Sequence, residues 1–222
     1  MRSTDERDLQ ISQNTLRLLI GVLGTALPVF LVLGAQTFLT SVSDYYYTNM
    51  RDSLEGVLFF LAVFLAAYRP YGQDGWHDDL ITTVSGVFAL LIALFPTVNV
   101  TLGHVPTGLV LPFIPIAWSG TLHNVGAGGL FVCFAVMSLF YFTKGKKGSR
   151  TRRKVLRNAV YIVCGLGIAG CIGSIGWGAV TAHDQKTRDL MPIFWPEAGA
   201  LVLFGFSWLV KGGLILRDQP AK

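Results

Sequence analysis

The chain has 222 residues, of which 52% are hydrophobic and 14% charged, and its mean hydropathy is +0.52. Soluble domains carry about 25% charged residues, so this composition excludes an ordinary soluble domain. The charges lie between long apolar runs, and a membrane-spanning helix needs about 20 apolar residues. The composition therefore predicts an all-α, polytopic transmembrane helix bundle.

Six apolar runs predict six spans, which places both termini on the same side of the membrane. The predicted spans are residues 16–39, 53–68, 80–96, 120–143, 158–180 and 196–210. We expect Pro28 to kink the first span, and Asp52 or Ser53 to cap the second. Glycine and alanine recur four residues apart in the fifth span, a spacing that permits close helix contact. This pattern predicts that the fifth span is a central packing helix.

Residues 99–119 are apolar but carry Pro106, Pro112 and Pro115. Proline removes a helical hydrogen bond and clashes with the preceding turn, so a continuous helix is disfavoured here. We predict an external or re-entrant loop lying over the membrane face. The alternative is a seventh, broken span.

Residues 144–157 form a basic loop with eight lysine and arginine side chains and no acid. Basic loops face the cytoplasm in membrane proteins, so this loop predicts that both termini are cytoplasmic. The net charge of +5 is then explained by topology and by contact with anionic lipid head groups, without nucleic acid as a partner. We predict a multi-pass membrane protein with this loop on the cytoplasmic side.

Polar and aromatic side chains are concentrated at the predicted external ends of the spans. The densest segment is residues 41–55, which we call the tyrosine corner. Ionisable groups within a span are costly and tend to face partners inside a bundle, so we expect a shared polar pocket. Its candidate members are Ser43, Asp44, Tyr45, Tyr46, Tyr47, Arg51, Asp52, Glu55, His104, His123 and Glu197.

Three interpretations of this pocket remain open. In the first it holds a lipid head group, with Arg51 binding a phosphate and the tyrosines forming an interfacial wall. In the second, Glu55, His123 and Glu197 bind zinc, manganese or iron. In the third, the charged groups form a structural network and the tyrosines an ordinary aromatic belt. The cofactor stays open, although the sequence carries no nucleotide-binding or haem signature.

Hydrolysis is a further hypothesis, because serine, histidine and aspartate occur together at this face. No nucleophile-elbow spacing singles out one serine. The candidates are Ser41, Ser43 or Ser119 as nucleophile, His104 or His123 as base, and Asp44 as the residue that orients the base.

Three short patterns carry a resemblance to known families. They are Ser41-Val-Ser-Asp-Tyr-Tyr-Tyr-Thr-Asn-Met-Arg-Asp52, then Phe95-Pro-Thr97, then His123 opening a glycine- and phenylalanine-rich helix. The chain resembles a group of uncharacterised bacterial six-span membrane proteins, and this resemblance implies a multi-pass protein of the cytoplasmic (inner) membrane of a bacterium. The order of features is also distantly similar to the Frag/DRAM/Sfk group of membrane proteins. That resemblance implies a role in lipid remodelling or lipid distribution, without naming a reaction.

A comparison with alkaline ceramidase-like hydrolases is less close, because the paired histidines of their last helix are missing here. The sequence thus predicts a membrane protein whose external pocket binds or processes a lipid head group. One alternative is a non-catalytic accessory or scaffold subunit of a larger membrane complex. A second alternative is a metal-dependent membrane hydrolase.

Overall fold

The computed structural model describes residues 2–68, 76–98, 103, 113–144, 152–181 and 193–216. In these residues the chain forms helices and no strand, which confirms the all-α prediction. The long helices are α1 (Arg2–Ala35), α2 (Arg51–Ala67), α3 (Trp76–Leu94), α4 (Ser119–Val136), α5 (Arg152–Thr181) and α7 (Phe194–Lys211). Short helical segments are the 3-10 turns η1 (Val42–Tyr47) and η2 (Ile116–Trp118), and the π-helical turn η3 (Met137–Tyr141) that extends α4.

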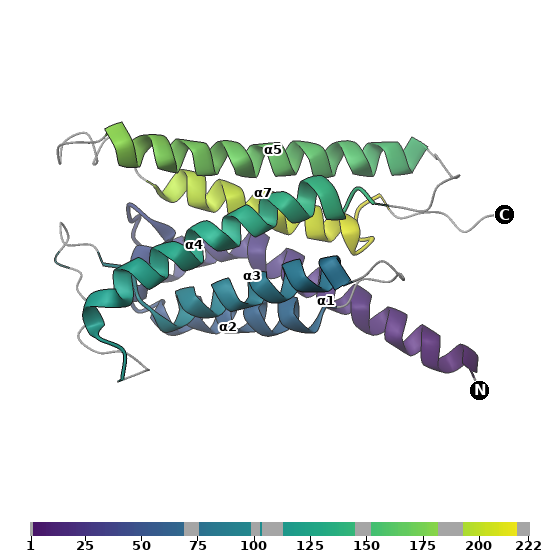
Figure 1. Cartoon of the computed structure of the whole chain (residues 1–222), viewed down its shortest axis with the longest axis horizontal. Coiled ribbons are helices and arrows are strands. Elements are labelled where there is room, and N and C mark those ends of the chain that lie inside the picture. The colour runs from purple at the N-terminus through teal and green to yellow at the C-terminus, as the bar shows by residue number, and fades with distance from the viewer. Residues whose placement is uncertain are drawn as a thin grey trace.

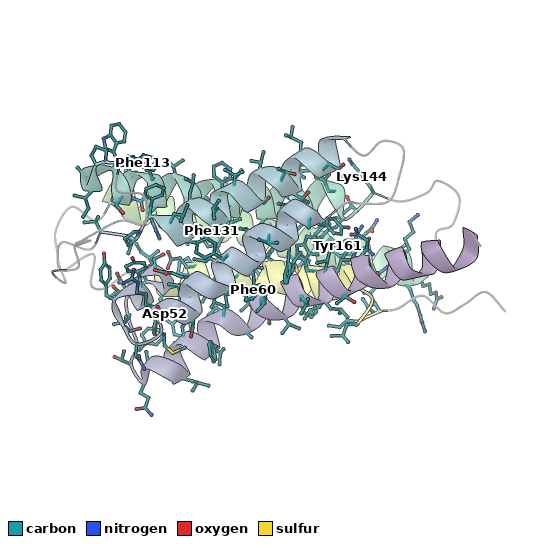
Figure 2. All side chains as sticks on the ribbon, turned by 90° about the horizontal axis from the view of Figure 1, so that it is seen from below. Asp52, Phe60, Phe113, Phe131, Lys144 and Tyr161 are labelled. Atoms are coloured by element: carbon teal, nitrogen blue, oxygen red, sulfur yellow. The ribbon has the colours of Figure 1, made fainter. Side chains whose placement is uncertain are left out.

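The six long helices lie side by side in one bundle and alternate in direction (Figure 1). Each packs against its neighbour along the chain, and α7 also packs against α1, so the helices form a closed ring. The starts of α2, α4 and α7 and the ends of α1 and α3 therefore share one end of the bundle. Asp52 and Phe113 mark that end in Figure 2, and Lys144 marks the other.

Three described helices are long and apolar enough to cross a membrane. They are Gln13–Ala35, Ile116–Tyr141 and Arg152–Thr181, and Asp79–Leu94 is a shorter apolar helix. Large apolar side chains also lie on the outside of the bundle, such as Phe30 on α1 and Leu166 on α5. Water would disfavour so much exposed apolar surface, whereas lipid would cover it. These features support a membrane protein.

Each predicted span coincides with one long helix, but some predicted helix ends are wrong. Helix α1 ends at Ala35 and not at residue 39, because Gln36 takes a left-handed φ of 52°. Helix α2 begins at Arg51 with no side-chain cap, so the predicted cap at Asp52 or Ser53 is not formed. Most of the proline-rich segment 99–119 lies outside the described residues.

Helix α7 supplies much of the bundle core. Its buried side chains include Phe204 and Trp208, both fully enclosed. The ring of Trp208 makes edge contacts with Tyr68 and Phe142, at centroid distances of 4.9 and 5.1 Å, and Phe204 stacks on Phe134. Edge-to-face aromatic pairs add roughly 0.5–1.5 kcal/mol each beyond area burial.

The prediction that the fifth span is the central packing helix is wrong for most of its glycines. A Cβ added at Gly170, Gly173, Gly176 or Gly178 would meet nothing within 4 Å, and α5 lies at one side of the bundle (Figure 1). Two backbones approach closely between α1 and α7, where a Cβ on Gly24 would lie 3.3 Å from the Cα of Gly205. Spacing alone cannot tell a glycine at a contact from one facing outwards.

Candidate functional site

The tyrosine corner begins with a serine-capped 3-10 turn. Ser41 has extended backbone angles, and its Oγ accepts a hydrogen bond of 3.1 Å from the Ser43 amide. Its carbonyl oxygen accepts a second bond of 3.2 Å from the Asp44 amide. Serine favours such caps because its hydroxyl satisfies a backbone amide that the turn leaves without a partner. This turn directs Ser43 and Asp44 toward the inside of the bundle end.

Glu197, in the first turn of α7, fixes the corner to the last helix. Its Oε2 accepts hydrogen bonds from the Ser41 hydroxyl and from the Val42 amide, both at 2.7 Å. A backbone bond of 2.7 Å from the Phe194 amide to the Thr40 carbonyl reinforces the contact. Residues more than 150 positions apart are therefore held together by one carboxylate and one amide.

His123, in the first turns of α4, fixes the corner to α3 and α4. Its ring is 4% exposed. Nδ1 lies 2.8 Å from the carbonyl oxygen of Phe95, and Nε2 lies 2.9 Å from the Oγ of Ser43. Phe95 follows the last residue of α3, where carbonyl groups lack a helical partner and are free to accept side-chain donors. The histidine therefore links the tyrosine corner, through Ser43, to the end of α3, through the Phe95 carbonyl.

Asp44 and Tyr45 turn inwards from the same segment. Asp44 is 1% exposed, and its Oδ2 accepts a hydrogen bond of 2.9 Å from the Thr40 hydroxyl. Tyr45 is fully buried, and its hydroxyl donates to the Thr37 carbonyl at 2.9 Å. Burying a polar group is costly unless the group is hydrogen-bonded. These bonds fix the segment between α1 and η1. Tyr45 is thus a core residue and takes no part in an interfacial wall.

Tyr46, Tyr47 and Arg51 form the outer side of the corner. The rings of Tyr46 and Tyr47 meet edge to face with centroids 5.2 Å apart. Arg51 donates to the Tyr46 hydroxyl at 2.7 Å and to Glu55 at 2.9 Å, with its guanidinium carbon 4.5 Å from the Tyr46 ring centre. Burial raises the pKa of Tyr46, and the Arg51 cation opposes that rise. The outer side of the corner therefore exposes the Arg51 cation, which is held in place by the Tyr46 ring and hydroxyl.

Tyr47 donates its hydroxyl proton to the Thr97 carbonyl. Burial is the main cause that raises its pKa from 10.0 to about 12, with Tyr46 and Asp44 adding to the rise. The phenol therefore stays neutral and remains a donor at physiological pH.

A pH-dependent loss of stability follows from this shift. The unfolded chain ionises Tyr47 near pH 10, whereas the folded chain does so only near pH 12. The stability that the neutral phenol contributes is therefore complete below pH 10 and falls as the pH rises toward 12. We expect the thermal unfolding midpoint in detergent to fall over this range, and to fall less in Tyr47→Phe. The same pH slope in both proteins would contradict this assignment.

The structure brings together some candidate residues and separates others. Ser43, Asp44, His123 and Glu197 meet around η1, whereas Asp52 is exposed and Glu55 pairs with Arg51. Within the described part of the chain, no three His, Cys, Asp or Glu side chains are close enough to hold a metal ion. His104 lies outside the described residues. Sequence reasoning missed the Phe95 carbonyl, for which the Phe95-Pro96 pair at the end of a helix was the available signal.

No protein-family model, curated protein or solved structure matches this chain. What the corner does must therefore be argued from its own contacts. Four separate elements supply those contacts: the end of α1 with η1, the end of α3, the start of α4 and the start of α7.

Proposed function

We propose that this chain is a six-span membrane protein whose tyrosine corner binds or processes the head group of a membrane lipid at one membrane face. The observation that carries the proposal is a cluster of buried Asp44 and His123 with partly buried Ser43 and Glu197, at the end of an otherwise apolar bundle. Charged and polar groups are costly at such a depth unless they have a function or a partner. A resemblance to the Frag/DRAM/Sfk group would fit the same role.

Exposed aromatic side chains support a position at the membrane–water boundary. Phe38 and Trp195 lie beside the corner with ring centres 5.4 Å apart, and Phe113 and Trp118 lie at the start of α4. Aromatic side chains are enriched at the level of the lipid head groups. In this position the corner meets the phosphate and ester groups of a lipid.

The opposite end of the bundle is basic and supports the orientation. Lys144 follows α4, and Arg152, Arg153, Lys154 and Arg157 lie in the first turns of α5. By the positive-inside rule this end faces the cytoplasm and contacts anionic lipid. The corner is then external and both termini are cytoplasmic. The resemblance to bacterial membrane proteins would place the chain in the inner membrane of a bacterium.

Arg51 is the group we assign to the lipid phosphate. Its side chain is 49% exposed, and the bonds to Glu55 and Tyr46 use two of its donors. A guanidinium has five N–H donors in a planar fork, so donors remain for a phosphate. The neutral Tyr46 and Tyr47 hydroxyls beside it add uncharged hydrogen-bonding groups.

Lipid retention tests this function. The purified protein is exchanged into nanodiscs of phosphatidylethanolamine and phosphatidylglycerol, released, and weighed by native mass spectrometry. We expect wild type to retain one phospholipid and Arg51→Gln to lose most of it, since one charge-assisted bidentate contact is removed. Arg152→Gln, at the opposite end, is the control and should retain phosphatidylethanolamine as wild type does. Equal retention by wild type and Arg51→Gln would refute the assignment.

A further inference from the structure

Ser43 and His123 have the geometry of a nucleophile and its base. Nδ1 of His123 faces a carbonyl oxygen, which can only accept a hydrogen bond, so the neutral ring must carry its proton on Nδ1. Nε2 then offers its lone pair to the Ser43 hydroxyl 2.9 Å away. The order nucleophile, base and orienting group is that of hydrolases that activate a serine.

The other two candidate serines lack this arrangement. The Ser41 hydroxyl donates a hydrogen bond to Glu197 and accepts one from the Ser43 amide. It is therefore used both as a donor and as an acceptor within the cap. The Ser119 hydroxyl is fully buried and donates to the Pro96 carbonyl at 2.8 Å, which cannot accept a transferred proton. Ser43 is only partly buried. Of the three, it alone combines an imidazole acceptor with access from outside.

The orienting group differs from the predicted one. Asp44 accepts from Thr40, and the Phe95 carbonyl oxygen is the group at Nδ1. A carbonyl at the end of a helix holds the ring in one tautomer without adding a charge to an apolar bundle. It also couples the base to the end of α3, so the positions of α3 and α4 set the distance from Nε2 to Ser43.

We propose that Ser43 is an acyl-accepting nucleophile and His123 its general base, acting on an ester bond of a membrane lipid. This proposal rests on the lipid site proposed above and names its substrate class. The Ser43 oxygen bonds to the acyl carbon, and its proton passes to Nε2 of His123. The bond from the acyl carbon to the lipid alcohol oxygen then breaks, and that oxygen takes the proton from Nε2.

Water completes the cycle. A water molecule attacks the acyl carbon of the Ser43 ester and gives a proton to Nε2. The acid leaves, and the Ser43 oxygen takes the proton back. No redox step or further co-reactant is needed, because the bonds formed and broken balance with water alone.

An alkyl fluorophosphonate tests the pair directly on the full chain in detergent micelles. Its phosphorus bonds to an activated serine oxygen as fluoride leaves and His123 takes the proton. We expect peptide mass spectrometry to find the phosphonyl group on Ser43. Ser43→Ala should abolish labelling, and His123→Gln, whose amide can still donate to Phe95, should slow it by roughly 100-fold or more. Ser119→Ala should label at the wild-type rate.

Folding is checked in the same samples by the thermal unfolding midpoint, so that labelling is compared only among folded proteins. Folded wild type that is not labelled, or labelling that persists in Ser43→Ala, would overturn the pair. The lipid-retention measurement separates the two proposals. A protein that retains lipid but is not labelled keeps the lipid site and loses the nucleophile, whereas one that retains no lipid loses the proposed function itself.

Discussion

Replacing Gly205 with valine is expected to force α1 and α7 apart and to lower the thermal unfolding midpoint. A Cβ at Gly205 would lie 2.5 Å from the backbone nitrogen of Thr25 and 2.6 Å from the carbonyl oxygen of Gly21. Backbone atoms cannot rotate away as a side-chain tip can, so the helices must separate. Overpacking costs about 1–3 kcal/mol and sometimes more, and here the closure of the helix ring depends on this contact.

Gly170→Val on α5 is the matched control. Both substitutions place the same side chain in a helix interior, so the intrinsic helix propensity changes equally. The Cβ at Gly170 meets nothing within 4 Å, and no packing is lost. We expect its midpoint in detergent to stay near that of wild type. A similar fall in both variants would show that the α1–α7 contact does not set the stability.

The helices were predictable from the sequence because their signal is composition over about 20 residues. Each apolar run became one helix, and the polar residues between runs mark the changes of direction. Exact ends were less predictable, since they depend on single backbone angles such as the positive φ of Gln36. Which helices pack against each other was not predictable from the sequence. Gly205 and the glycines of α5 look alike in the sequence, and only the ring arrangement of helices distinguishes them.

The candidate site was predictable in its side chains but not in its pairs. Histidine, serine and carboxylates near the ends of separate spans indicate a shared end, and His123 and Glu197 both contact the turn η1, which carries Ser43. The Phe95 carbonyl has no side-chain signature, so the sequence predicts Asp44 as the orienting group instead. The predicted metal site of Glu55, His123 and Glu197 is not formed in the described residues, because the Glu55 side chain pairs with Arg51.

Replacing Glu197 with alanine is expected to destabilise the bundle by roughly 3 kcal/mol, because a buried donor left without its partner costs about 1–3 kcal/mol and two donors are affected. The Val42 amide cannot reorient within its turn, whereas the Ser41 hydroxyl can rotate. Glu197→Gln keeps a carbonyl oxygen at the same distance from the backbone, so its free energy of unfolding should fall by less than half as much as that of Glu197→Ala. Thermal midpoints of the three proteins in one detergent measure this order, and an alanine variant as stable as wild type would contradict it.

The same pair of variants links the corner to its proposed chemistry. Glu197 accepts a hydrogen bond from the Ser41 hydroxyl. The Ser41 hydroxyl in turn accepts a hydrogen bond of 3.1 Å from the Ser43 amide. When the carboxylate is lost, the turn that aims the Ser43 hydroxyl at His123 is no longer fixed. At temperatures well below its unfolding midpoint, Glu197→Ala should therefore react with the fluorophosphonate more slowly than wild type. Glu197→Gln should be labelled at nearly the wild-type rate. If folded Glu197→Ala labels at the wild-type rate, Glu197 stabilises the bundle without positioning the nucleophile.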